Sequence, residues 1–270
     1  MNIHPTAIVH PKAEIDSSVV IGPYSIIGEH VKIGKCTVIA NNVVVEGYTT
    51  IGENNRIFSY AVLGTGPQDI SYKGEKVYLN IGNNNLLREY VTVNAGSPKG
   101  EAVTLFGNGC MIMAYCHIAH DCVVEDNVIM ANAVQIGGHV KIESDANFGG
   151  LAGIHHFATI GEKSFVGGLT RIVHDVPPYM TVEGHPAKVK AVNVIGLRRH
   201  GFSSEKIQAI KNAMKLVYRS GIPKSQALKI LEEQQPQFDE VLKFVNFLKA
   251  LDEGNQGRAR ERLRKASPAH

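Results

Sequence analysis

An apolar residue recurs at every sixth position along most of this chain, and that period limits the folds open to it. The pattern runs unbroken from Ile3 to Leu63 and again from Phe106 to Ile172. A period of six fits neither an α-helix nor the two-residue alternation of an ordinary strand. Hexapeptide repeats build a parallel β-helix with one short strand and one corner per repeat. We therefore predict a mainly β fold, in which three hexads close each coil.

The same period predicts the register of the coils. Residues eighteen apart should stack in columns at the inter-strand spacing of about 4.8 Å. The periodic residues and the small or β-branched residues four positions later should fill the interior. Glycine often follows the periodic residue directly, as at Gly22 and Gly34. We attribute glycine and asparagine at the corners to a need for positive φ.

Two segments interrupt the hexads, at residues 64–80 and about 95–105. Leu63 and Ile81 are eighteen positions apart, so we expect the first loop to replace one full coil. Val93 and Phe106 are thirteen apart, so the second break shifts the phase by one residue. Loops that leave a rigid solenoid tend to carry binding residues.

Helical periodicity replaces the hexads after Pro186. We predict a β-helical domain over residues 1–190 and a small helical domain over 191–270, with helices near 203–221, 225–233 and after Pro236. The chain then ends in a basic tail, for which a frayed, solvated terminus is the simplest expectation. Its charged residues are Arg258, Arg260, Arg262, Arg264 and Lys265.

Composition favours a cytoplasmic protein. The net charge is only +3, which gives no reason to expect a nucleic-acid partner. No apolar stretch approaches the roughly 20 residues that span a bilayer, and the N-terminus lacks a signal sequence. Cys110, Cys116 and Cys122 occupy the small inward position of successive hexads, so we expect them in the core rather than at a zinc ion.

Half of the chain's 12 histidines fall between residues 117 and 174. They are His117, His120, His139, His155, His156 and His174. Adding eighteen to His120 gives Gly138, then His156, and adding eighteen to Asp121 gives His139. A histidine base, a carboxylate beside it and a backbone N–H one coil away are the groups that acyl transfer needs. The column offers no serine or cysteine nucleophile, which favours direct transfer.

Two other interpretations of this cluster stay open. The histidines could decorate solvent-facing corners of an inert scaffold, or three of them could hold zinc between subunits. A lone prism has flat or convex faces, whereas a substrate needs a concave site. An acyltransferase of this shape is therefore expected to be an oligomer with its cleft between subunits.

Several segments carry a family resemblance. His117–Cys122 reads His-Ile-Ala-His-Asp-Cys, Asp175–Tyr179 reads Asp-Val-Pro-Pro-Tyr, Arg199–Ser203 reads Arg-His-Gly-Phe-Ser, and Tyr218–Gly221 reads Tyr-Arg-Ser-Gly. Together these resemble the UDP-N-acetylglucosamine O-acyltransferase family of lipid A biosynthesis, over nearly the whole chain.

The resemblance implies a left-handed β-helix, a homotrimer, and no metal or cofactor. It implies transfer of a 3-hydroxyacyl chain from acyl carrier protein to the sugar 3-hydroxyl. His120 would be the general base, Asp121 would support it, and the Gly138 N–H would bind the oxyanion. Residues expected to contact the substrates are Gln68, Asp69, His117, His139, His155 and His156. Asn193 and Arg199 would hold the nucleotide, and Gly168 would leave room at the end of the acyl groove.

This chain also departs from the family pattern. Asn94–Ser97 reads Asn-Ala-Gly-Ser where the family has His-Arg-Gly-Thr. Ser71 replaces a usual lysine, His156 a glutamine and Ile195 a glutamate. We expect Asn94 and Ser71 to weaken contacts to the sugar diphosphate. A 3-amino analogue of the sugar, a sibling hexapeptide transferase using another nucleotide sugar or acetyl-CoA, and a zinc-binding β-helix protein remain alternatives.

Overall fold

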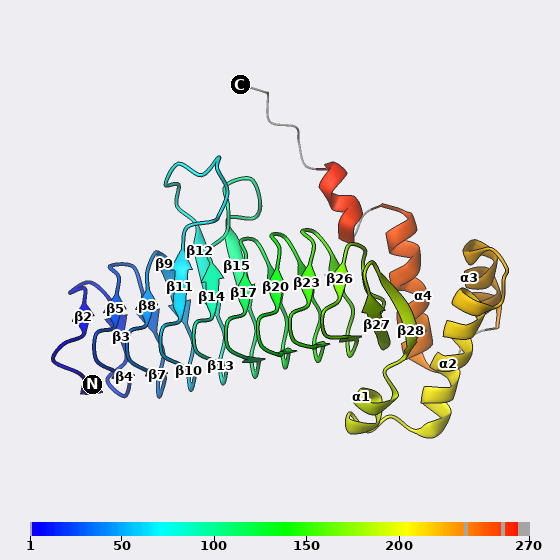
Figure 1. Ribbon diagram of the computed structural model, residues 1–270, viewed down its shortest axis with the longest axis horizontal. Helices are drawn as coiled ribbons and strands as arrows, with labels where there is room; N and C mark the ends of the chain where they lie inside the picture. The colour runs from blue at the N-terminus through cyan, green and yellow to red at the C-terminus, as the bar shows by residue number, and fades with distance from the viewer. Residues whose placement is uncertain (1, 235–236, 255–256, 264–270) are drawn as a thin grey trace.

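Three parallel sheets form the sides of a triangular β-helix. The computed structural model describes residues 2–234, 237–254 and 257–263. Up to β26, successive strands belong to successive sheets, so each coil contributes one strand to each of them (Figure 1). The last two strands, β27 and β28, both extend the first sheet, and they pair antiparallel with each other. The fold is a left-handed parallel β-helix with a few C-terminal helices, as predicted.

We name the sheets A, B and C. Sheet A holds β1 (Asn2–Ile3), β4 (Val20–Ile21), β7 (Val38–Ile39), β10 (Arg56–Ile57), β13 (Leu86–Leu87), β16 (Met111–Ile112), β19 (Ile129–Met130), β22 (Asn147–Phe148), β25 (Phe165–Val166), β27 (Met180–Gly184) and β28 (Ala187–Val192). Sheet B holds β2 (Ile8–Val9), β5 (Ile26–Ile27), β8 (Val44–Val45), β11 (Val62–Thr65), β14 (Thr92–Asn94), β17 (His117–Ile118), β20 (Gln135–Ile136), β23 (Gly153–Ile154) and β26 (Arg171–Ile172). Sheet C holds β3 (Glu14–Ile15), β6 (Lys32–Ile33), β9 (Tyr48–Ile51), β12 (Tyr78–Ile81), β15 (Val103–Phe106), β18 (Val123–Val124), β21 (Lys141–Ile142) and β24 (Thr159–Ile160).

The register follows the eighteen-residue columns except at the two loops. Ile118 pairs with Ile136, which in turn pairs with Ile154. Ile81, however, pairs with Ile51, thirty positions earlier. The expectation that the first loop replaces a full coil is therefore wrong. The chain leaves sheet B after β11, makes an excursion over residues 66–77, and enters sheet C of the same coil at β12.

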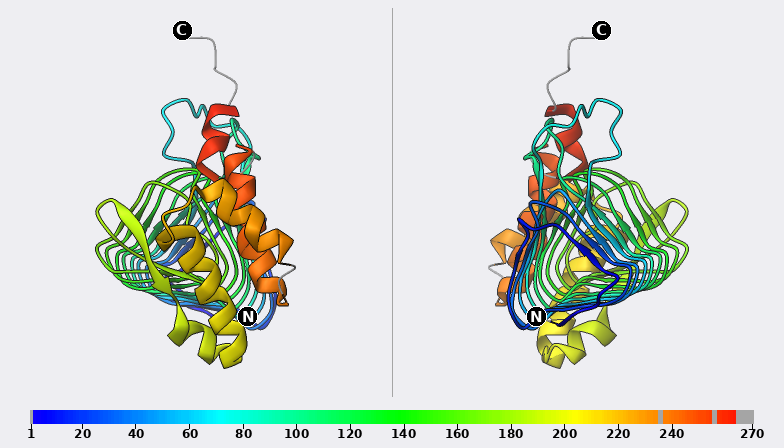
Figure 2. Two further views of the ribbon diagram at one scale, coloured as in Figure 1. Left: turned by 90° about the vertical axis from the view of Figure 1, so that its right-hand side faces the viewer. Right: turned by 90° about the vertical axis from the view of Figure 1, so that its left-hand side faces the viewer.

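Both loops leave from the same edge of the prism, where the chain passes from sheet B to sheet C. We call this the B–C edge. The first loop joins β11 to β12, and the second, residues 95–102, joins β14 to β15. Figure 2 shows the loops on one edge of the triangular cross-section, with the C-terminal end of the described chain beside them. The two loops and the C-terminal end of the described chain are thus gathered on one edge.

The glycines after the periodic residues serve a purpose other than the predicted one. A Cβ on Gly22 would lie 2.7 Å from the carbonyl carbon of Ala40 in the next coil, and no positive φ is involved. The left-handed conformation instead falls on the corner residue two positions later, and larger side chains accept it, as at Tyr60, His139 and Lys163. Glycine is required here by the close approach of neighbouring coils.

The interior is lined by the predicted apolar columns. Cys110, Cys116 and Cys122 are buried among them as free thiols, which confirms the core assignment. Burial raises the pKa of the Cys110 thiol to about 12 and that of Cys116 to about 11. These thiols are therefore protonated packing groups.

Helices close the C-terminal end of the prism. They are α1 (Val194–Arg199), α2 (Ser204–Arg219), α3 (Lys224–Glu233) and α4 (Asp239–Asp252), followed by the 3₁₀ turn η1 (Gly257–Leu263). The Ser203 hydroxyl caps α2 by accepting from the Lys206 N–H. The short helix α1 was not predicted, because six residues carry too little periodicity. Among the described residues, no helix is both long and apolar enough to cross a membrane.

A glycine substitution tests this account of the coil spacing. Gly22→Ala should lower the free energy of unfolding by about 1–3 kcal/mol, because its methyl group would overlap the backbone of the next coil. Gly153→Ala is the matched control, since a Cβ there meets nothing within 4 Å. Thermal unfolding of both variants checks this. Equal midpoints would contradict a steric role for Gly22.

Candidate active site on the B–C edge

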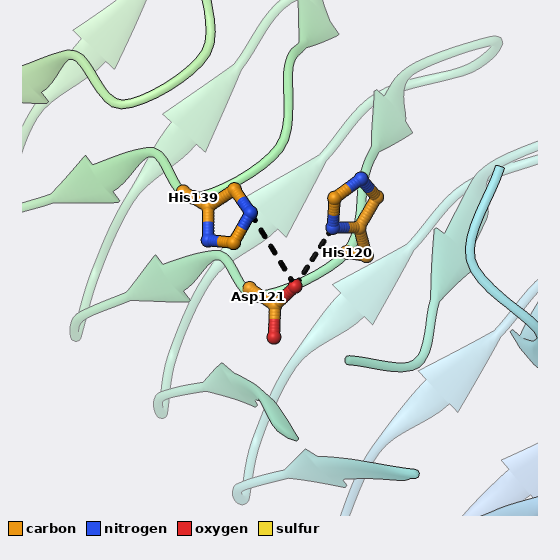
Figure 3. A group of neighbouring side chains, drawn as sticks. All are labelled: His120, Asp121 and His139. Atoms are coloured by element: carbon orange, nitrogen blue, oxygen red, sulfur yellow. Dashed lines mark hydrogen bonds and ion pairs between the residues drawn. The ribbon is translucent and has the colours of Figure 1, made fainter. Parts of the chain in front are cut away.

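His120, Asp121 and His139 form a cluster on the B–C edge (Figure 3). His120 Nδ1 lies 2.7 Å from Asp121 Oδ2, and His139 Nε2 lies 3.7 Å from the same oxygen. Asp121 and His139 both have φ near +60° and stack one coil apart, joined by the His139 N–H that donates to the His120 carbonyl at 2.9 Å. The left-handed corner therefore aims these side chains at one another.

The second loop holds the Asp121 carboxylate in place. The Ser97 N–H donates to Oδ1 at 2.9 Å, and the Ser97 hydroxyl donates to Oδ2 at 2.5 Å. The loop also packs so closely that a Cβ on Gly100 would lie 2.4 Å from Oδ1. Sequence reasoning missed Ser97, because a serine in an irregular loop has no periodic signal.

The surroundings of Asp121 keep it ionised. Burial raises the pKa of its carboxyl, but the hydrogen bonds from His120 and Ser97 outweigh this and hold the pKa below its usual value. An ionised Asp121 accepts the Nδ1–H of His120. The His120 Nε2 is then the lone-pair nitrogen, which is the arrangement of a general base.

Gly138 lies directly against the His120 ring. A Cβ on Gly138 would be 2.8 Å from His120 Cε1, so no side chain fits between these coils. Among the described residues, the Gly138 N–H donates to no backbone carbonyl. A backbone donor therefore adjoins the imidazole, as a site that binds a developing oxyanion requires.

Two adjoining hollows surround this cluster. The first, about 480 Å³, is lined by Gln68, His117, His120, Gly138 and His155, among others. The second, about 410 Å³, adds Asp69, His139 and His156. The structure thus brings together the catalytic candidates and six of the predicted substrate-contacting residues.

Several of these residues have fixed partners. His117 Nδ1 lies 2.7 Å from the Thr92 hydroxyl, and burial lowers the His117 pKa. Asp69 accepts hydrogen bonds from the Ser71 N–H and hydroxyl, which lower its pKa. His117 is therefore held neutral, and Asp69 stays charged at the entrance.

Three other predicted residues lie elsewhere in the chain. Asn193 and Arg199 line a separate cavity of about 510 Å³ together with outward residues of sheet A. Gly168 sits on the edge between sheets A and B, after β25. The Asn193 amide is used internally, since Nδ2 donates to the Lys163 carbonyl and Oδ1 accepts from the Gly196 N–H. A single chain does not place these residues beside His120.

Asn94 joins the two loops at their bases. Its side chain is buried, and Nδ2 donates to the Thr65 hydroxyl at 2.8 Å. This contact ties the base of the second loop to the base of the first. That Asn94 weakens contacts to the sugar diphosphate stays a prediction.

The basic tail also differs from expectation. The Arg258 and Arg260 side chains fold back onto the B–C edge and donate to groups of the prism. The expectation of a frayed terminus is wrong for these two residues. The side chain of Arg262, together with Arg264 and Lys265, lies outside the described part of the chain.

The geometry of the cluster bears on the zinc alternative. Among the described residues of one chain, the candidate ligand set is His120, Asp121 and His139. Ligand atoms about 2.0–2.2 Å from a tetrahedral zinc ion lie roughly 3.3 Å apart. The 2.7 Å contact from His120 to Asp121 is instead a charge-assisted hydrogen-bond distance. The residues present fit a base and its orienting carboxylate better than a metal.

This chain is similar to known proteins in both sequence and structure. Residues 175–258 match a family model described as UDP N-acetylglucosamine O-acyltransferase, domain 2, and residues 12–47 and 104–138 match bacterial transferase hexapeptide repeats. The acyl-[acyl-carrier-protein]–UDP-N-acetylglucosamine O-acyltransferase of Anaeromyxobacter sp. is 50% identical over 254 residues, which cover 94% of this chain and 99% of that one. The enzyme of the same name from Synechocystis sp. is 49% identical, but over 61% of this chain and 59% of its own length. The LpxA structure from Acinetobacter baumannii superposes with a TM-score of 0.88 at 43% identity, covering 92% of this chain and 96% of that one.

The contact from Ser97 to Asp121 can be tested through its pH dependence. Because the Asp121 pKa is lowered by folding, its stabilisation is present above the unfolded value near 3.9 and is lost as the pH falls through the folded value. Ser97→Ala should therefore cost about 1.5–3 kcal/mol at pH 7, and this cost should shrink below pH 4. Urea unfolding at pH 7, 4 and 3 measures it, with Ser97→Thr as the control that keeps the hydroxyl. A loss independent of pH would show that Ser97 acts only by packing.

Proposed function

Since this chain belongs to the UDP-N-acetylglucosamine O-acyltransferase family, we propose that it moves a 3-hydroxyacyl chain from acyl carrier protein to the 3-hydroxyl of UDP-N-acetylglucosamine, the first step of lipid A biosynthesis. The observation that carries this proposal is the hydrogen-bonded series from Ser97 to Asp121 to His120, with the Gly138 backbone against the imidazole. It supplies a base, its orienting anion and an oxyanion donor in one place.

In the proposed reaction, His120 acts first as a general base and then as a general acid. His120 Nε2 removes the proton of the sugar 3-hydroxyl as its oxygen attacks the thioester carbonyl. The Gly138 N–H donates to the oxyanion of the tetrahedral intermediate, and the Asp121 carboxylate stabilises the imidazolium that has formed. When the intermediate collapses, the C–S bond breaks, and His120 returns its proton to the departing thiolate of the carrier protein.

No acyl-enzyme is part of this proposal. Cys116 and Cys122, the thiols nearest in sequence, point into the core, where burial raises the pKa of Cys122 to about 12. A buried, protonated thiol is a poor nucleophile. The sugar hydroxyl therefore attacks the thioester directly.

The hollows on the B–C edge suit a sugar and a thioester. Gln68 and Asp69 approach from the first loop, while His117, His139, His155 and His156 come from successive coils. This ring of hydrogen-bonding groups supports recognition of hydroxyl and amide groups beside the base.

We propose that further copies of the chain complete the site, in a homotrimer. Arg199 and Gly168, assigned to the nucleotide and the acyl chain, lie away from His120 in one chain. The edge between sheets A and B also exposes a column of large apolar side chains beside Gly168. Its members are Tyr60, Tyr90, Tyr115, Leu151 and Leu169, each at least 43% exposed. Such a column supports a cyclic contact between copies and an apolar path for the acyl chain.

Removing the base tests the proposed function. His120→Ala should lower kcat by about two to four orders of magnitude, the usual share of a positioned general base, with UDP-N-acetylglucosamine and a 3-hydroxyacyl carrier protein as substrates. His174→Ala is the matched control, because it belongs to the same column of the prism but is exposed and outside the hollows. Thermal unfolding verifies that both variants fold, and the 3-amino sugar nucleotide is assayed in parallel. Wild-type turnover by His120→Ala at saturating substrate would overturn the proposal.

A further inference from the structure

The C-terminal segment lies along the same edge as the site. We call residues 257–261 the strap. Arg260 Nη2 donates to the carbonyls of His139 and Phe157, at 2.9 and 3.1 Å. These two carbonyls belong to successive coils of one corner column. The strap therefore lies against the B–C edge, where Figures 1 and 2 show the 3₁₀ turn η1 beside the last coils of the prism.

Arg258 contacts a residue that lines the hollow of the base. Its Nη1 lies 2.6 Å from His155 Nδ1 and donates to the His156 carbonyl at 2.9 Å. A guanidinium has only donors and stays protonated. His155 Nδ1 also lies 3.4 Å from the His156 carbonyl, which can only accept, but the 2.6 Å contact to Arg258 is much the shorter. We therefore assign Nδ1 as an acceptor and place the imidazole proton on Nε2. Arg258 thus selects one tautomer of a histidine that shares a hollow with His120 and Gly138.

Gly257 and Glu261 also fit the strap closely against the prism. Gly257 has φ +59°, and a Cβ there would lie 2.1 Å from the Asp175 carboxylate, which accepts the Arg258 N–H at 3.2 Å. Glu261 lies 2.5 Å from His156 Nε2 and 3.0 Å from Arg258 Nη1. His156 is one of the positions where this chain departs from the family pattern. Glu261 of the strap therefore pairs with a histidine that stands where the family pattern has another residue.

We propose that Arg258 is a positioning residue for the acyl transfer, which fixes His155 as a neutral Nε2–H donor to an oxygen of the bound substrate. The inference rests on the proposed function. Arg258 acts through His155 and does not touch the reacting atoms. A wrong tautomer would place a lone pair where the substrate oxygen needs a proton, so the effect falls on substrate binding.

Arg258→Met separates this role from simple packing, because it keeps the length of the side chain but removes the donors. In ¹⁵N NMR spectra of histidine-labelled protein, His155 should change from a single Nε2–H tautomer to a mixture. The KM for UDP-N-acetylglucosamine or for the 3-hydroxyacyl carrier protein should rise about three- to tenfold, the range of one lost hydrogen bond, with a smaller change in kcat. Arg258→Lys should restore much of both signals, because the ammonium still donates to Nδ1. Gly257→Ala, which displaces the strap, should resemble Arg258→Met.

Arg219→Met is the matched control. Arg219 also donates to a backbone carbonyl, that of Lys190, but in the helical part of the chain. If Arg258→Met lowers only the thermal midpoint, as Arg219→Met is expected to do, and leaves tautomer and KM unchanged, the strap is a packing element and the inference is wrong. If the wild-type protein shows no acyltransferase activity, the proposed function fails instead, while the NMR spectra still decide whether Arg258 sets the His155 tautomer.

Discussion

The hydrogen-bond ladder between successive coils is the constraint on which the other features of this molecule depend. Outside the coils that carry the two loops, it fixes each residue directly above the one eighteen positions earlier, so a site can be built from residues far apart in sequence. His120, Gly138 and His156 are neighbours only because the coils keep this spacing. Glycines such as Gly22 allow the backbones to approach, and inward Ile, Val and Cys side chains fill what remains.

The corners of the prism carry the side chains of the candidate site. Most corners from Tyr24 onward contain a residue with positive φ, which costs about 1–2 kcal/mol for a residue other than glycine. The ladder offsets that cost, since the left-handed residue donates its N–H to the coil below, as His139 does to His120. On the B–C edge these positions carry Asp121, His139 and Phe157. The left-handed backbone at these corners therefore directs the three side chains toward the two loops that leave from the same edge.

The columns could be predicted from the sequence, but the contacts of the loops could not. Periodicity located the sheets, the buried cysteines and the stacking of Gly138 on His120, because these depend on spacing alone. Ser97 lies in an irregular loop, Asn94 ends β14 where that loop begins, and Arg258 lies in a single 3₁₀ turn. No period predicts which group a side chain at such a position will meet. The same limit explains the wrong prediction for the first loop. The spacing from Leu63 to Ile81 is eighteen residues, which is also the length of one coil. The helix α1 was missed for a related reason, because its stability comes from packing against the last coil rather than from its own sequence.

We propose that each site takes its base, His120, from one chain and its nucleotide contacts, such as Arg199, from another copy. Mixed trimers of His120→Ala and Arg199→Met test it most directly, with the two chains co-expressed under different affinity tags and purified through both. In a cyclic trimer, every mixed assembly then holds one intact site of three, so about a third of the wild-type activity should return although each variant alone is impaired. Mixed trimers no more active than the average of the two parent variants would contradict the account, because the complete site would then lie within a single chain.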